Sequence, residues 1–315
     1  MLIPVLLGIS LVVLVIIDAT PGDPARMMLG AQATQEQVDE LRDELGLNDS
    51  LPVRYVRFLR NIINGDLGAS FKTKRPIADE MLQRFPYTLV LVTFSLIFSI
   101  LLGIPIGIYA ATHQYSWKDN TAIFLSLICV SMPSFWFALL LIRFFGVQLR
   151  VLPIAGVSTW KGWILPCFAM ALGLAALLAR QMRSDILEVL RQDYVTTARA
   201  KGLSNRRVIY RHVLKNAMIP VIMVVGAVFG SSLGGSLITE MIYSIPGLGQ
   251  YIMSALSNRD YPVIQSGILI LSTMFAIIIL VVDVVFALVD PRIRSQYVRK
   301  SGRKGEKLLE AKEEA

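Results

Sequence analysis

Long apolar blocks are the feature of this sequence that most restricts its fold. Two of them, Tyr87–Ala111 and Ile264–Leu288, exceed the roughly 20 residues that a helix needs to cross a bilayer core about 30 Å thick. Charged residues make up 17% of the chain, whereas a soluble domain carries about a quarter. The sequence therefore predicts an all-α membrane protein that crosses the bilayer several times.

Hydropathy predicts six transmembrane helices. They are Leu2–Ile17, Tyr87–Ala111, Thr121–Phe145, Trp163–Leu178, Met218–Leu237 and Ile264–Leu288. The first block, within residues 1–18, lacks the basic start and the small-residue cleavage site of a signal peptide, so we interpret it as a retained membrane helix. The other five lie within residues 86–289, which we expect to form one membrane-embedded core.

The distribution of charge predicts how the chain is oriented. Net charge is +8, and the basic residues gather after the fourth and sixth apolar blocks. Because Lys-rich and Arg-rich loops stay on the cytoplasmic side, we expect residues 181–217, a basic tail at 290–315 and both termini to be cytoplasmic. The polar, slightly acidic segment 19–85 is then expected on the extracytoplasmic side of the cell (inner) membrane. The sequence has no recognisable nucleic-acid-binding module, so the charge indicates membrane topology and no nucleic-acid partner.

The segment 19–85 contains two stretches with the spacing of amphipathic helices. Apolar residues recur at helical spacing in Thr34–Leu45 and again from Leu51 onward, where Pro52 suits a first helical turn. A solvated linker lacks such periodicity. We therefore predict small helices that cap the outer mouth of a helical bundle.

The segment 181–217 has the pattern of two short helices joined by a sharp bend. Gly202 suits the left-handed conformation that ends a helix, and Ser204 is expected to cap the start of the next helix. Leu203 and Val208 have the spacing of a hydrophobic staple, which fixes the angle at which a chain enters a helix. The segment is therefore expected to be a rigid, bent unit.

Basic residues continue beyond this bend. Arg207, Arg211 and Lys215 are spaced four apart and are expected on one side of the second helix. A rigid basic projection is suited to docking on another protein, while a helix resting on anionic lipid is the alternative that charge alone leaves open. The glycine bend and the capped helix favour a docking element.

The same segment resembles the EAA loop of ABC importer permeases. The family pattern reads Glu-Ala-Ala, three residues and then Gly, and Thr196, Thr197, Ala198 and Gly202 stand at these positions. Only part of that general pattern is kept. The run that begins Asp193-Tyr and continues as Ala-Arg-Ala-Lys-Gly-Leu, followed by Arg-His-x-Leu-Lys-Asn-Ala, resembles the dipeptide, oligopeptide and nickel branch more specifically.

Other short motifs that resemble this branch follow in order along nearly the whole chain. They are Pro21–Pro24, Gly65–Gly68, Ser131–Trp136, Ile245–Gly249, Asn258–Val263 and Asp290–Arg294. A chance match of this extent is implausible. The resemblance implies a type I (MetI-like) importer permease core with an extra N-terminal helix and an extracytoplasmic helical insertion.

The resemblance also implies partners and a set of functional residues. A second homologous permease would complete the translocation path, two ABC ATPases would bind the ATP and Mg²⁺, and an extracytoplasmic binding protein would deliver the cargo. This chain itself would hold no cofactor. The residues implied in ATPase coupling are Asp193, Thr196, Thr197, Ala198, Lys201, Gly202, Leu203, Arg206, Arg207 and Arg211.

Small and polar residues in the last two spans are candidates for lining the path. They are Ser231, Ser232, Ser236, Thr239 and Asp283. An ionisable residue at the depth of Asp283 is a functional candidate by default, although a carboxylate bonded to a neighbouring helix is the interpretation we favour. Glu240 and Arg143 fall near the ends of their predicted spans and receive no role.

Several activities are disfavoured by residues that the sequence lacks. No Gly-x-x-x-x-Gly-Lys-[Ser/Thr] motif occurs, so ATP hydrolysis is left to a partner. His113 and His212, the two histidines, fall outside the predicted spans and have no partner at metal-ligand spacing. We therefore expect neither an enzyme nor a metal site, and Cys129 and Cys167 are expected only to pack.

The sequence leaves two alternatives. An ion-coupled secondary transporter is a remote alternative, supported only by Asp283. The cargo is undetermined: short peptides lead, because they are the commonest cargo of the family that the chain resembles, and glutathione, nickel or a metal chelate are the alternatives.

Overall fold

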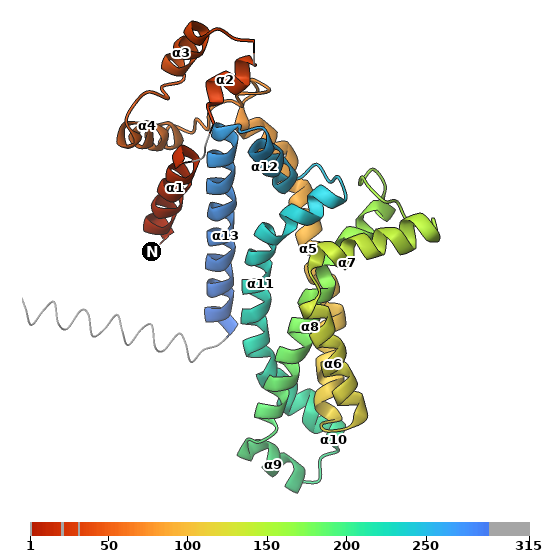
Figure 1. Cartoon of the computed structure of the whole chain (residues 1–315). Helices are drawn as coiled ribbons and strands as arrows, with labels where there is room; N and C mark the ends of the chain where they lie inside the picture. The colour runs from red at the N-terminus through yellow and green to blue at the C-terminus, as the bar shows by residue number, and fades with distance from the viewer. Residues whose placement is uncertain (1, 20–21, 31, 290–315) are drawn as a thin grey trace, which may run out of the picture. The chain divides into compact units, whose positions relative to one another are not determined.

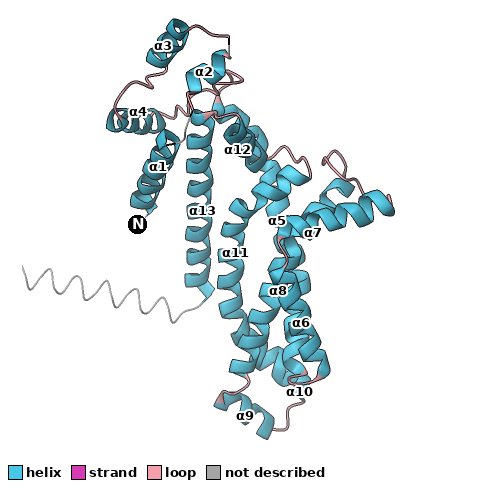
Figure 2. Ribbon diagram, viewed as in Figure 1, coloured by secondary structure: helices cyan, strands magenta, loops and turns pink. Residues whose placement is uncertain are grey.

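The computed structural model describes residues 2–19, 22–30 and 32–289, and the regular structure within them is helical. Figure 2 shows helices joined by loops, and in these ranges the only β-type pairing is an isolated antiparallel bridge between Ala69 and Pro76. The predicted all-helical fold is therefore confirmed. The predicted basic tail, residues 290–315, lies outside the described residues.

The helices follow one another along the chain and are joined by turns and loops (Figure 1). The α-helices are α1 Leu2–Ala19, α2 Pro24–Leu29, α3 Gln35–Glu44, α4 Leu51–Ile63, α5 Ile77–Thr112, α6 Trp117–Ser131, α7 Ser134–Leu141, α8 Ile164–Val189, α9 Asp193–Ala200, α10 Asn205–Arg207, α11 Leu214–Ile242, α12 Leu248–Ser257 and α13 Tyr261–Val289. A 3-10 helix, Trp160–Trp163, precedes α8, and π-helical turns occupy Ile142–Gln148 and Val208–Val213.

Each of the six predicted spans falls on helical structure, but not all of them on one long helix. Four helical stretches are long and apolar enough to cross a membrane: Ile77–Thr112, Trp160–Val189, Asn205–Ile242 and Tyr261–Val282. The bent pair formed by α6 and the α7 segment makes a fifth span if it is counted as one. The apolar helix α1 is shorter than these.

The prediction of one continuous span over Thr121–Phe145 needs correction. The helix breaks after Ser131 and resumes at Ser134, with Pro133 as the residue that precedes the new helix. Proline has no amide hydrogen, and its ring clashes with the preceding turn, so it ends helices or starts new ones. The sequence contained this signal, but the apolar block around it masked the interruption.

The described residues divide into two compact units. Of these residues, unit 1 comprises 2–19, 22–30, 32–95, 132–171 and 231–276, and unit 2 comprises 96–131, 172–230 and 277–289. Unit 1 contains α1 to α4, α7 and α12, and unit 2 contains α6, α9 and α10. Parts of α5, α8, α11 and α13 belong to each unit.

In unit 1, the amphipathic helix α4 packs beside α1 (Figure 1). The Tyr55 hydroxyl donates to the Leu7 carbonyl at 2.8 Å and lies 3.1 Å from the Ser10 hydroxyl. Arg54 forms an ion pair with Asp18 at the other end of α1. These contacts tie the segment after α1 back onto that helix.

The helices predicted within residues 19–85 are confirmed. Thr34 caps α3 in a reciprocal box with Gln37, and Val38 is fully buried. The helix α4 begins at Leu51 with Pro52 in its first turn. Such caps satisfy amide groups that a helix leaves unpaired at its start.

The end of this segment is fixed to the turn between α12 and α13. The buried Asp260 carboxylate accepts the Phe71 amide at 2.9 Å and also bonds the Ser70 hydroxyl. Nearby, the Ser266 hydroxyl donates to the Leu67 carbonyl at 3.0 Å. The segment is therefore a docked part of unit 1, as its apolar periodicity predicts.

In unit 2, two glycines allow α5 and α8 to approach closely. A Cβ atom added to Gly103 would lie 2.5 Å from the Ala175 carbonyl oxygen, and one added to Gly107 would lie 2.5 Å from that of Ala179. Small residues spaced by four positions are a common way to pack membrane helices backbone to backbone. This contact packs the middle of α8 against α5.

Candidate functional site

The segment between α8 and α11 in unit 2 forms the expected bent unit, which we call the elbow (residues 190–213). The helix α8 continues to Val189, so the elbow is shorter than the predicted 181–217. The helix α9 is followed by Gly202 at φ +77°, in the left-handed region that favours glycine. Ser204 then precedes α10 in an extended conformation, but its side chain makes no cap hydrogen bond, so the predicted side-chain cap is not formed. The predicted bend is therefore present.

An apolar cluster holds the elbow against the rest of unit 2. Val195 of α9 and Val208 and Val213 of the π-helical turn are fully buried with Met182 and Ile186 of α8. Leu203 packs against the same cluster as Val208, as the hydrophobic staple predicts. Close-packed protein interiors resist small displacements, so the elbow and the adjoining end of α8 are expected to move as one rigid piece.

The polar residues of the elbow form its exposed face. The exposed side chains include Asp193, Thr196, Thr197, Lys201, Arg206, Arg207 and Arg211. The Thr197 hydroxyl donates to the Asp193 carbonyl at 3.0 Å, which orients this threonine along α9. At the start of α11, the Asn216 side chain donates to the Tyr194 hydroxyl at 2.8 Å. The elbow therefore presents a polar, mainly basic surface on a fixed apolar base.

Two details of the predicted elbow need correction. Ala198 is only 6% exposed and belongs to the apolar cluster, so its side chain packs inward and does not line a contact surface. Val208–Val213 is π-helical, with more residues per turn than an α-helix. The regular four-residue stacking expected for Arg207, Arg211 and Lys215 therefore does not apply, although all three are exposed.

The residues predicted to line a path lie mostly inside unit 1. Ser232, Ser236 and Thr239 are buried, whereas Ser231 is exposed. The Ser236 hydroxyl lies 2.9 Å from the Leu233 carbonyl and 3.2 Å from a Glu240 oxygen. The structure therefore assigns Ser236 to an internal polar site. Asp283 lies on α13, and its side chain is outside the described residues.

Glu240 is the centre of that polar site and was missed in the sequence analysis. Its side chain is fully buried near the end of α11. Oxygen Oε1 accepts the Thr88 hydroxyl of α5 at 2.7 Å, and Oε2 accepts the Gln250 amide of α12 at 3.0 Å. Thr88 in turn accepts the Leu248 amide at 2.9 Å. One carboxylate therefore connects three helices and occupies the amino-terminal end of α12, where a negative charge is favoured.

The Ile245–Gly249 turn is shaped around this carboxylate. A Cβ atom on Gly247 would lie 2.4 Å from Oε2 of Glu240, and one on Gly249 would lie 2.9 Å from the same atom. Both glycines are therefore required by a close approach. The signal in the sequence was an acidic residue beside a membrane span, which is rare unless it has buried partners.

A metal site is not formed by the part of the chain that the structure describes. Within these ranges, no three or more His, Cys, Asp and Glu side chains are grouped to hold an ion. His113 bonds the Tyr109 carbonyl and the Thr112 hydroxyl, and His212 lies in the π-helical turn of the elbow.

Comparison with protein families decides what kind of protein carries these sites. The family model for the binding-protein-dependent transport system inner membrane component matches residues 103–295. The model for the N-terminal membrane component of such systems matches residues 1–92. This chain belongs to that family of ABC importer permeases. The family is one of multi-pass inner-membrane subunits that are not themselves enzymes, and in general it implies a partner permease, ATPase subunits and a binding protein.

Curated relatives resemble the chain over almost its whole length. A dipeptide transport system permease protein of Alkalihalophilus pseudofirmus is 42% identical, over 93% of this chain and 97% of the relative. Glutathione transport system permease proteins of Salmonella paratyphi A and of Escherichia coli strain K12 are each 40% identical, over 93% of this chain and 96% of the relative.

Solved structures support the fold. Inward-facing structures of a methionine ABC transporter match with a TM-score of 0.58 at 17% identity, covering 67% of this chain and 96% of the matched chain. An amino acid ABC transporter solved with histidines gives a TM-score of 0.51 at 15% identity, with 68% and 94% covered. At these identities the likeness shows the importer permease fold alone.

Proposed function

We propose that this chain is one of two permease subunits in an ATP-driven importer of short peptides. The observation that carries the proposal is the elbow, a rigid bend with a basic exposed face, in a chain that belongs to the importer permease family. The cargo class is supported by the dipeptide and glutathione permeases that are 42% and 40% identical to it. A second, homologous permease would form the other half of the path.

The coupling step would take place at the exposed face of the elbow. A partner ATPase binds ATP and Mg²⁺ and contacts Thr196, Thr197 and Lys201, while Arg206, Arg207 and Arg211 pair with acidic groups around its cleft. Asp193 and Thr197 belong to the same face, and Gly202 and Leu203 set its angle. When ATP binding closes the two ATPases on each other, the elbow is displaced with them.

The orientation follows from the positive-inside rule. We propose that the elbow, both termini and the basic segment 290–315 are cytoplasmic. The helices α2 to α4 then lie on the opposite side of the membrane, where they meet the loaded binding protein. Ser231 and Asp283 remain the candidates for lining the path.

Uptake by a reconstituted complex tests this function. Proteoliposomes that contain this permease, its partner permease and both ATPases are expected to take up a labelled dipeptide only when the binding protein and ATP are present. An ion gradient without ATP is expected to drive none. Uptake that follows an ion gradient after ATP is removed would instead show a secondary transporter. Titrating the binding protein with peptides and with Ni²⁺ chelates separates the two cargo classes.

A further inference from the structure

The turn between α5 and α6 in unit 2 is held in an unusual conformation. Tyr115 has φ +62°, a region that residues with a side chain rarely adopt. Its amide donates to Oδ2 of Asp119 at 2.9 Å, and the Ser116 hydroxyl donates to the His113 carbonyl at 2.6 Å. Such local strain persists only where the surroundings impose it. Asp119 is therefore the residue around which this turn is built.

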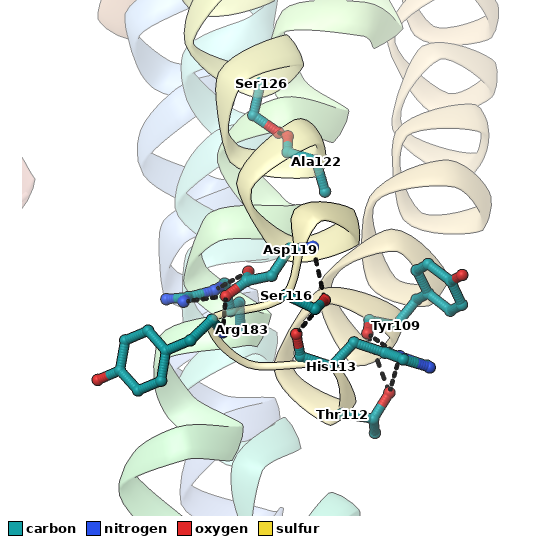
Figure 3. Close-up of polar contacts among 9 residues, drawn as sticks. Tyr109, Thr112, His113, Ser116, Asp119, Ala122, Ser126 and Arg183 are labelled. Carbon is teal, nitrogen blue, oxygen red and sulfur yellow. Dashed lines mark hydrogen bonds and ion pairs between the residues drawn. The ribbon is translucent and has the colours of Figure 1, made fainter.

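Asp119 is fully buried and makes a two-pronged ion pair with Arg183 of α8 (Figure 3). Arg183 Nε lies 2.6 Å from Oδ1, and Nη2 lies 2.7 Å from Oδ2. Paired, parallel bonds of this kind fix both distance and orientation. The two residues are 64 positions apart, so the pair joins two helices that are distant in the sequence.

Arg183 stands on the turn of α8 that anchors the elbow. Its neighbour Met182 and, one turn later, Ile186 are fully buried in the cluster that contains Val195 and Val208. Because α8 is one continuous helix to Val189, a movement of the elbow moves Arg183 with it. The ion pair joins this part of α8 to the start of α6.

We propose that Asp119 and Arg183 are positioning residues that transmit displacement of the elbow from α8 to α6 during the ATP cycle. This inference rests on the proposed function. Buried ion pairs often add little stability compared with apolar packing, and their best-attested role is to fix one register. If the elbow is to displace α6 through α8, the two helices must keep a fixed register.

The test separates transmission from simple stabilisation with four variants of the reconstituted complex. Arg183→Gln removes the positive charge. Arg183→Lys keeps the charge but cannot form the two parallel hydrogen bonds to Asp119. The Asp119→Asn/Arg183→Gln double variant leaves no unpaired buried charge. Ser184→Ala, at the exposed neighbour of Arg183, is the control. For each we measure labelled peptide taken up per ATP hydrolysed, the amount of assembled complex and its thermal midpoint.

We expect uptake per ATP to fall about tenfold in Arg183→Lys and in the double variant, within the usual range of coupling effects, while both assemble and melt close to the parent. Ser184→Ala is expected to match the parent. If uptake per ATP recovers together with the thermal midpoint in the double variant, the pair is only structural and the inference is overturned.

The outcome for the parent complex is a separate criterion. A parent that shows no ATP-driven uptake contradicts the proposed function itself, whereas a parent that transports normally beside unaffected variants contradicts only the role of the ion pair. If Arg183→Gln does not assemble, the decision rests on the lysine and double variants.

Discussion

Replacing Gly202 with valine is expected to lower peptide uptake per ATP hydrolysed by about tenfold or more, within the usual range of coupling effects. Gly202 has φ +77°, where a side chain costs about 1–2 kcal/mol and a β-branched one is a marked outlier. No atom lies within 4 Å of an added Cβ, so the cost arises from the backbone alone. Relaxing that bend turns α9 relative to α10 and displaces the docking face.

Assembly of the complex is expected to survive this substitution, because Val195 and Val208 keep the elbow packed on α8. Gly202→Asn is the matched control, since asparagine tolerates the left-handed region. Uptake and phosphate release measured in the same proteoliposomes, with co-purification of the ATPase, compare both variants with the parent. Parental uptake per ATP in Gly202→Val would show that the bend does not set the coupling geometry.

Replacing Glu240 with alanine is expected to lower the stability of unit 1 by about 2–4 kcal/mol, because several buried donors lose their acceptor. The Thr88 hydroxyl and the Gln250 amide would lose the acceptor of the bonds that they donate, and a cavity would open beside Gly247. Glu240→Gln keeps one acceptor oxygen and is expected to fall between the parent and the alanine variant.

The thermal midpoint of the purified protein in detergent checks that stability falls from the parent to Glu240→Gln and then to Glu240→Ala. Glu40→Ala is the control, because Glu40 is exposed on α3 and such surface changes usually stay within about 0.5 kcal/mol. A midpoint for Glu240→Ala equal to that of the control would mean that the carboxylate does not hold α5, α11 and α12 together.

Features with a local signal could be predicted from the sequence. Apolar blocks gave the helices, Thr34 with Gln37 gave the start of α3, and Gly202 gave the bend of the elbow. In each case the residues that decide the structure lie within a few positions of one another, so spacing alone contains the information.

Features that depend on distant partners could not be predicted in this way. Glu240 is held by Thr88, which precedes it by 152 positions, and Asp119 is held by Arg183. The inward orientation of Ala198 depends on its packing with α8 and the π-helical turn. The break at Pro133 had a local signal, which the continuous apolar block around it outweighed.

The central claim, that the elbow docks on a separate ATPase, is tested most directly by photo-crosslinking in the intact complex. A photoreactive residue at Lys201 or Arg206 is expected to form a crosslink with the ATPase subunit. The same probe at Ile63, an exposed position on α4, is expected to form none. Crosslinks from Lys201 and Arg206 to lipid alone, in a complex that contains the ATPase, would contradict this account.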